Sequence, residues 1–210
     1  MPSFLLRREG FTRFQTVFAA IVFLLFAVVV IAEVSSYLKL HGTAHALESA
    51  KTLDTLLAQY ATENDGAYPT GEGTRAPGKS VGIALDLLQT QFTPNADIFA
   101  VGSTTRYAGT DKDYADLAPE NMSWDFTAGA NTTTGIKTDE PDSLPLLYTT
   151  SETVDYRPGQ SVTLSGHGPF GSHGMIVALK SGAVEYRQGA SSVFVPADFK
   201  GTGTYTQIKP

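Results

Sequence analysis

An apolar run near the N-terminus constrains this chain more than any other feature. From Val17 to Ala32, sixteen consecutive residues carry no charge, and nearly all of them are Val, Ile, Leu, Phe or Ala. Arg7 and Arg8 precede the run, and Glu33 follows it. A helix from residue 11 to residue 32 would be roughly 33 Å long at about 1.5 Å per residue, which is enough to cross the core of a bilayer.

The basic flank of the run predicts its orientation. Because Arg and Lys beside a membrane span stay on the cytoplasmic side, residues 1–10 are expected in the cytoplasm and the rest of the chain beyond the membrane. A cleaved secretory signal is a competing interpretation, but its cleavage site should closely follow the apolar region. The nearest Ala-x-Ala, Ala44-His45-Ala46, lies far downstream inside a helical pattern. A plain, uncleaved membrane anchor is the other alternative.

The helical pattern continues beyond the predicted membrane segment, residues 11–32, as an amphipathic stretch, residues 33–65. Its apolar residues recur every three or four positions, namely Leu47, Ala50, Leu53, Leu57 and Tyr60. No proline interrupts residues 11–65, so one long helix is expected, with Gly42 as the point where it could bend. Asn64-Asp65-Gly66 predicts the helix end. We expect the stripe after residue 46 to pack on a sheet, whereas the earlier part needs lipid or other subunits.

The N-terminal residues resemble a known processing signal. A short basic leader, residues 1–10, ends at Gly10, Phe11 follows, and the long apolar helix comes a few residues later. This arrangement resembles the class III signal of type IV pilins and type II secretion pseudopilins. Residues 57–69, LAQYATENDGAYP, are similar to the end of the long helix in many pseudopilins. The resemblance implies that prepilin peptidase cuts between Gly10 and Phe11 and that Phe11 is then methylated.

One residue departs from the family pattern. The fifth residue of the processed chain is usually Glu, thought to pair with the N-terminal amine of a neighbouring subunit, and here it is Gln15. Gln can hydrogen-bond but cannot form an ion pair, and Arg13 adds a like charge near the amine. The resemblance therefore implies a minor subunit rather than an abundant one, with Phe11, Arg13 and Gln15 as its assembly residues. Lineage drift at position 15 is the alternative.

The resemblance also implies a location and partners. The chain would be a single-pass protein of the bacterial inner membrane, with a cytoplasmic N-terminus and a periplasmic head, until it joins a filament. Expected partners are other pilin or pseudopilin subunits, prepilin peptidase, an inner-membrane assembly platform with its ATPase, and membrane lipid. A net charge of −6 gives no support to a nucleic-acid partner. Secretion, adhesion and DNA uptake all stay open as the task of the filament.

Residues 66–210 are predicted to form the head, which together with the helix gives an α+β, pilin-like fold. Ser80 is expected to cap a short helix that contains Ile83, Leu85, Leu87 and Leu88. The expected strands are Asp97–Val101, Leu146–Thr149, Ser161–Leu164, Met175–Leu179 and Ala183–Arg187, the last two joined as a hairpin through Lys180-Ser181-Gly182. We assign Trp124 and Phe126 to the core and residues 128–143 to a long loop. The hairpin resembles a C-terminal motif of pilin-like proteins of planctomycete and verrucomicrobial type.

Acidic residues are concentrated in the middle of the chain. Residues 63–150 carry 13 acidic and 5 basic side chains. Asp111, Asp113 and Asp116 could gather around calcium through their oxygen atoms, although their spacing is not that of an EF-hand. Major pseudopilins similar to this chain often bind calcium in a downstream loop, so the resemblance supports this site. A solvated acidic loop is the alternative.

The sequence favours a structural role over an enzymatic one. The chain has no cysteine, no Gly-x-Ser-x-Gly elbow and no His-Glu-x-x-His motif. His41 and His45 are spaced as metal ligands on a helix, but neither they nor His167 and His173 have a third ligand close in sequence. We therefore predict that the chain is not an enzyme. A membrane-anchored binding or sensing module and an anchored hydrolase that uses His167 or His173 are the competing hypotheses.

Overall fold

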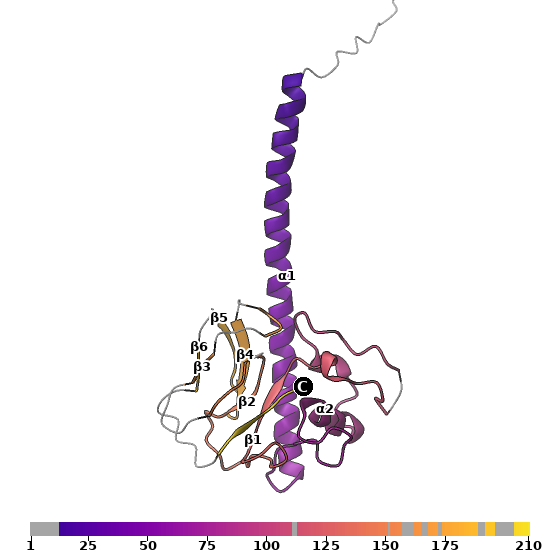
Figure 1. The fold of residues 1–210 in the computed structure, drawn as a ribbon, viewed down its shortest axis with the longest axis vertical. Helices are drawn as coiled ribbons and strands as arrows, with labels where there is room; N and C mark the ends of the chain where they lie inside the picture. The colour runs from indigo at the N-terminus through magenta and orange to yellow at the C-terminus, as the bar shows by residue number, and fades with distance from the viewer. Residues whose placement is uncertain are drawn as a thin grey trace, which may run out of the picture. The chain divides into compact units, whose positions relative to one another are not determined.

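A computed structural model describes residues 13–110, 113–150, 152–156, 162–164, 168–171, 174–188, 192–195 and 204–210. The chain divides into two compact units, Met1–His41 and Gly42–Pro210. Helix α1, Arg13–Glu63, contributes residues to both units (Figure 1). Gly42, the first residue of the second unit, is helical.

The end of α1 lies where the sequence predicts it. Asp65 and Gly66 adopt positive φ angles of 52° and 75°, which end the helix by turning the backbone into the left-handed region. The N–H of Gly66 donates to the carbonyl oxygen of Ala61 at 2.8 Å. Of the predicted apolar stripe, Ala50, Leu53 and Leu57 are buried, whereas Leu47 and Tyr60 are half-buried and pack against the core.

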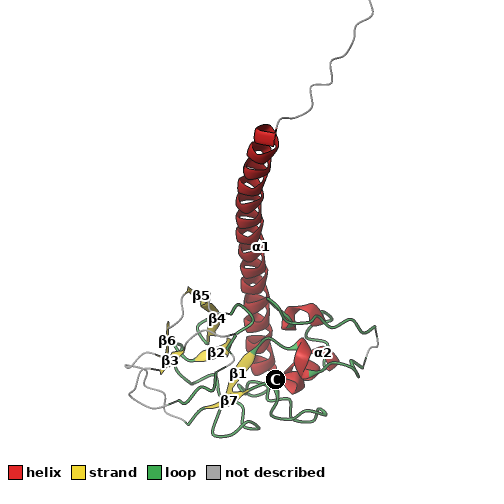
Figure 2. Cartoon of the chain, turned by 45° about the horizontal axis from the view of Figure 1, so that its top comes forward, coloured by secondary structure: helices red, strands yellow, loops and turns green. Residues whose placement is uncertain are grey.

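An antiparallel five-stranded sheet forms the centre of the second unit. Its strands, in spatial order, are β5 (Val184–Gln188), β4 (Gly174–Leu179), β2 (Pro145–Tyr148), β1 (Asp125–Ala128) and β7 (Thr206–Ile208). In Figures 1 and 2, strands β2, β4 and β5 lie on one side of the C-terminal part of α1, and helix α2 (Ser80–Gln89) lies on the other. Two further strands, β3 (Val162–Leu164) and β6 (Ser192–Val195), pair separately. The fold is therefore α+β, as predicted.

The predicted hairpin and core residues are confirmed. Strands β4 and β5 pair in the expected way, and the turn between them closes through the N–H of Gly182, which donates to the carbonyl oxygen of Leu179 at 2.9 Å. Trp124 and Phe126 are buried, and the indole N–H of Trp124 donates to the carbonyl oxygen of Ile98 at 2.9 Å. The segment between β1 and β2 contains no helix or strand, so the long loop predicted at residues 128–143 is confirmed apart from its first residue, Ala128, which ends β1.

Two local predictions are wrong. Asp97–Val101 does not form a strand, because the Asn95 side chain accepts the N–H of Asp97 and starts a 3₁₀ helix, η1 (Ala96–Phe99). Ser80 does not cap α2, because the helix already includes it and Lys79 occupies the capping position without a side-chain bond. The Ser80 hydroxyl is instead buried, with no hydrogen-bond partner in the described part of the chain. A second 3₁₀ helix, η2 (Pro119–Asn121), precedes β1.

Candidate functional site

The predicted processing and assembly residues are only partly within the described structure. Gly10 and Phe11 lie outside the described residues. Arg13 is the first residue of α1, and Gln15 lies in its first turn. The backbone therefore places Arg13 and Gln15 on one continuous helix with the apolar run.

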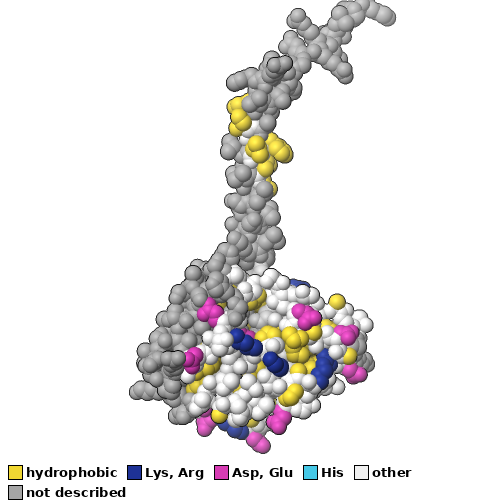
Figure 3. Space-filling view, viewed as in Figure 1, with side chains coloured by type: hydrophobic (Ala, Val, Ile, Leu, Met, Phe, Trp, Pro, Cys, Tyr) yellow, Lys and Arg dark blue, Asp and Glu magenta, His cyan; other side chains and the backbone are white. Residues whose placement is uncertain are grey.

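The first unit exposes large apolar side chains on α1. Those described as exposed are Phe18, Ile21, Val22, Phe23, Leu24, Phe26 and Val30. Phe23 is 72% exposed and Phe18 is 61% exposed. At about 100° of rotation per residue, these positions are distributed around the whole helix rather than along one stripe. Figure 3 shows apolar side chains at the surface of this part of the helix.

A helix that is apolar all round is stable only when it is buried in lipid or in other protein. We call the exposed apolar side chains that the structure describes between Phe18 and Val30 of α1 the apolar helix surface. Within the described part of the chain, no helix is both long and apolar enough to cross a bilayer.

A polar cluster lies inside the second unit, where β1 and β7 meet residues 152–156. Gln207 is its centre. The Gln207 side-chain oxygen accepts the N–H of Val154 at 2.8 Å. Its amide nitrogen donates to the Asp125 carboxylate at 2.9 Å and to the carbonyl oxygen of Glu152 at 3.0 Å. One amide thus ties residues 152–156 to two strands.

Asp125 is the buried acid of this cluster and is only 2% exposed. Burial raises the pKa of Asp125 to about 7, while the hydrogen bond from Gln207 and the charge of Lys209 act in the opposite direction. Desolvation has the larger effect on the pKa because the hydrogen bond from Gln207 replaces only part of the hydration that an ionised carboxylate loses. Asp125 is therefore partly protonated at neutral pH.

Two tyrosines, the buried Tyr148 and the half-buried Tyr156, extend the cluster. The Tyr156 hydroxyl lies 2.6 Å from the Thr127 hydroxyl and 3.1 Å from the Tyr148 hydroxyl. Burial raises the pKa of both Tyr148 and Tyr156 well above the usual value for tyrosine, so both stay protonated. Neutral hydroxyls bonded to one another hold strands in register, but they provide no nucleophile. The described part of this cluster contains no histidine, and His167 and His173 lie outside the described residues.

A second buried acid, Asp54, lies on the part of α1 that faces the core. Burial raises the pKa of Asp54 to about 6. The turn between β4 and β5 lies against it, since a Cβ atom added to Gly182 would be 3.6 Å from the carboxylate. The carboxylate of Asp54 accepts no hydrogen bond from the described residues. It is a source of pH dependence in the packing of α1.

The predicted calcium residues are exposed where they are described. Asp113 and Asp116 are exposed, and Asp111 lies outside the described residues. Among the described side chains, no three His, Asp or Glu residues gather closely enough to hold a metal ion. The calcium site stays a prediction, since one of its three residues is not placed.

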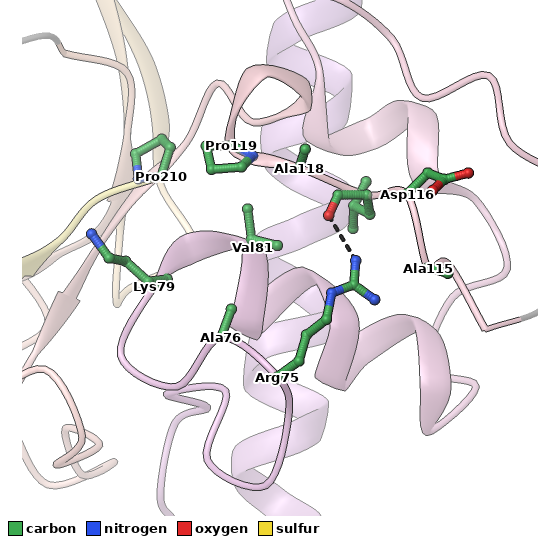
Figure 4. A pocket seen from close by; sticks show the side chains of 10 residues that line it. Arg75, Ala76, Lys79, Val81, Ala115, Asp116, Ala118, Pro119 and Pro210 are labelled. Atoms are coloured by element: carbon green, nitrogen blue, oxygen red, sulfur yellow. Dashed lines mark hydrogen bonds between the residues drawn. The ribbon is translucent and has the colours of Figure 1, made fainter.

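An open pocket of about 520 Å³ lies between the loop before α2 and the segment before β1. Its lining residues are Arg75, Ala76, Lys79, Val81, Ala115, Asp116, Leu117, Ala118, Pro119 and Pro210. Arg75 fixes the two walls to each other, because its guanidinium donates to the carbonyl oxygens of Tyr114 at 2.8 Å and Leu117 at 2.7 Å. Figure 4 shows the bond from Arg75 to Leu117 as a dashed line.

Sequence reasoning missed both the polar cluster and the pocket. Asp125 stands between the apolar residues Trp124 and Phe126, and an acid at a buried strand position is the one local signal that could have marked it. Gln207 and Lys79 lie in ordinary polar surroundings and carry no such signal. The pocket brings together segments 75–81, 115–119 and residue 210, which only the fold makes neighbours.

Comparison with protein-family models, with curated proteins and with solved structures finds no match to this chain.

Proposed function

We propose that this protein is a structural subunit, of the minor pseudopilin kind, of a type II secretion or type IV pilus-like filament. Prepilin peptidase would remove residues 1–10, and the processed chain would assemble through its N-terminal helix. The observation that carries the proposal is α1 itself. One helix has exposed large apolar side chains at residues 18–30 and a buried apolar stripe from Ala46 to Ala61.

A helix with one exposed apolar part and one part buried in its own globular unit fits a filament subunit. The buried stripe anchors the helix in its own globular unit. The apolar helix surface has no such partner among the described residues, so it needs lipid before assembly and the helices of other subunits after it. Because lipid is as apolar as these side chains, close packing rather than water exclusion would drive the exchange.

Processing is the decisive test of this function. The natural protein, purified from its own membranes, should have an intact mass that corresponds to a chain starting at a methylated Phe11. Replacing Gly10 with a bulky residue should leave the leader in place and keep the chain out of filaments. A mature chain that starts at Met1 would contradict the proposal and would support an uncleaved, membrane-anchored binding or sensing module.

The minor-subunit part of the proposal depends on Gln15. Gln15→Glu would restore the carboxylate that can pair with a neighbour's N-terminal amine. We expect this variant to enter filaments more often than the natural chain and at positions along the shaft. Quantitative immunolabelling of filaments checks this. Unchanged incorporation and position would leave the filament proposal intact and remove the basis for a minor subunit.

Calcium binding by Asp111, Asp113 and Asp116 is a separate proposal within this function. If the three carboxylates gather around the ion, isothermal titration should detect one calcium per chain, and Asp113→Asn should weaken it by about tenfold or more. Asp139→Asn, which changes an exposed acid of the loop between β1 and β2, is the matched control. Equal effects of the two variants would indicate a solvated acidic loop.

A further inference from the structure

The pocket between the loop before α2 and the segment before β1 has a defined chemical character. Ala76, Val81 and Pro119 give it an apolar wall of small side chains. Figure 4 shows Lys79 and Arg75 on either side of Ala76 and Val81, with Ala118 and Pro119 above them in the view. The pocket thus combines a small apolar surface with two separated cations.

The two cations differ in how they are held: Arg75 is fixed by hydrogen bonds, whereas the side chain of Lys79 forms none with a described residue. Arg75 is held by two backbone carbonyl oxygens, and both bonds come from one terminal nitrogen, Nη2. A guanidinium has five N–H donors, so the remaining ones stay available while the group is already fixed in place. Lys79 is exposed and forms no ion pair with any described residue. Asp116 is the one acid among the described lining residues, and Figure 4 shows its carboxylate directed away from both cations.

The charge of the pocket contrasts with that of the surrounding chain. Residues 63–150 contain 13 acidic and only 5 basic side chains, and two of those five line this pocket. On the face shown in Figure 3, Lys and Arg side chains lie next to apolar ones on the second unit, with acidic side chains mainly around them. Such a local reversal of sign favours an acidic ligand and discourages other partners.

We propose that this pocket binds an acidic, extended segment of a partner protein. Carboxylates of the segment would meet Arg75 and Lys79, and its small side chains would pack against Ala76, Val81 and Pro119. Arg75 and Lys79 lie on either side of Ala76 and Val81 (Figure 4), and an extended peptide carries side chains at regular intervals, so two of its carboxylates could meet the two cations while the residue between them packs on the apolar side chains. The volume of about 520 Å³ lies within the range of ligand pockets. The binding role goes beyond filament assembly and does not depend on it.

Lys79 is the residue to change, because it is exposed and its side chain forms no hydrogen bond to a described residue. Lys79→Glu reverses one charge of the pocket. The variant should fold, since Lys79 holds the N-terminal capping position of α2, where a negative charge is favourable. Lys137→Glu, an exposed change outside the pocket lining, alters the net charge equally and is the matched control.

The experiment uses the full chain in an uncharged detergent. The probe is a fluorescein-labelled ten-residue peptide of alternating glutamate and alanine, and its control has glutamine in place of glutamate. Fluorescence anisotropy at low salt should show the glutamate peptide binding about tenfold more tightly than the glutamine peptide. Lys79→Glu should abolish most of this preference, while Lys137→Glu should retain it.

Four outcomes would overturn the proposal. Equal binding of the two peptides would show that the pocket does not recognise carboxylates, and equal losses in the two variants would reduce the effect to general charge attraction. Competition by free glutamate as strong as that by the peptide would make this a small-carboxylate site. Sedimentation in which Lys79→Glu, but not Lys137→Glu, removes self-association without any peptide binding would assign the pocket to a second copy of the chain.

Discussion

Asp125 shows how one buried side chain can set the pH dependence of the fold. Its pKa in the folded protein is about 7, against an ordinary value of 3.8. The folded state therefore holds this proton more tightly than the unfolded chain does. The stability that Asp125 contributes is complete below about pH 4 and is lost as the pH rises through 7. Asp54, with a pKa of about 6, likewise makes the protein less stable as the pH rises, over a range that ends near pH 6.

We predict that Asp125→Asn makes the free energy of unfolding less sensitive to a rise in pH from 4 to 8. The Asn oxygen can still accept the hydrogen bond from Gln207, but it does not ionise. Relative to the natural chain, the variant should gain on the order of a few kcal/mol between pH 4 and pH 8, at about 1.36 kcal/mol per pKa unit. Urea denaturation of both proteins across this range measures the difference. Parallel pH profiles would show that Asp125 is not the group responsible.

Ser80 allows a direct comparison of sequence reasoning with the structure. If Ser80 capped the helix, its replacement by Ala would cost about 1 kcal/mol. The structure buries its hydroxyl without a partner among the described residues, so we predict that Ser80→Ala is neutral or stabilising by up to about 1 kcal/mol. Asn95→Ala is the control, because Asn95 does cap η1 and its loss should cost about 1 kcal/mol. Chemical denaturation of the two variants tests both values, and a cost at Ser80 equal to that at Asn95 would restore the capping role.

At the scale of elements, two helical glycines are predicted to respond in opposite ways to the same substitution. A Cβ atom at Gly82 in α2 would lie 2.0 Å from the carbonyl oxygen of Ala76, which is backbone and cannot move aside cheaply. A Cβ atom at Gly42 in α1 would meet nothing within 4 Å. Gly42→Ala should therefore stabilise the helix by up to about 1 kcal/mol. Gly82→Ala should destabilise the protein by about 1–3 kcal/mol through overpacking.

Thermal unfolding followed by circular dichroism measures both effects. Because Gly82 lets α2 approach the loop that carries Arg75 and Lys79, Gly82→Ala should also weaken binding of an acidic peptide. A stabilising effect at both positions would mean that the loop before α2 moves freely, and the fixed pocket would lose its support.

The elements that the sequence predicted well are those governed by local patterns. The end of α1 follows from Asp65-Gly66, and the β4–β5 hairpin follows from two apolar runs around Gly182. Strands β1 and β7 were not predicted, because each has only three or four residues and becomes a strand through pairing with the other. Phe126 pairs with Ile208, more than eighty positions away in the chain, and no local pattern encodes that pairing.

The candidate sites divide in the same way. The apolar helix surface is a continuous run and could be predicted from residues 17–32 alone. The Asp125–Gln207 contact joins β1 to β7 and becomes visible only when the sheet order is known. The pocket likewise depends on the bonds from Arg75 to Tyr114 and Leu117, about forty residues away.

At the scale of the whole molecule, the two compact units should respond separately to mutation. Phe23 belongs to the unit Met1–His41 and is 72% exposed, whereas Phe92 belongs to the other unit and packs against Tyr60 at a ring distance of 5.4 Å. If the apolar helix surface serves membrane residence and assembly, a polar change there should leave the globular unit unaltered. A polar change at Phe92 should have the reverse effect.

We predict that Phe23→Asp lowers membrane partitioning and filament incorporation while the denaturation midpoint of the globular unit stays the same. Placing Asp instead of Phe in a membrane-spanning helix costs about 3 kcal/mol, or roughly a hundredfold in partitioning. Flotation of the full chain with lipid vesicles measures the first quantity, and urea denaturation measures the second. Phe92→Asp should lower the midpoint, because it removes apolar packing against Tyr60, and should leave flotation unchanged. If Phe23→Asp floats with vesicles as well as the unchanged chain does, the apolar helix surface does not mediate membrane residence. The filament proposal, which rests on α1, would then lose its support.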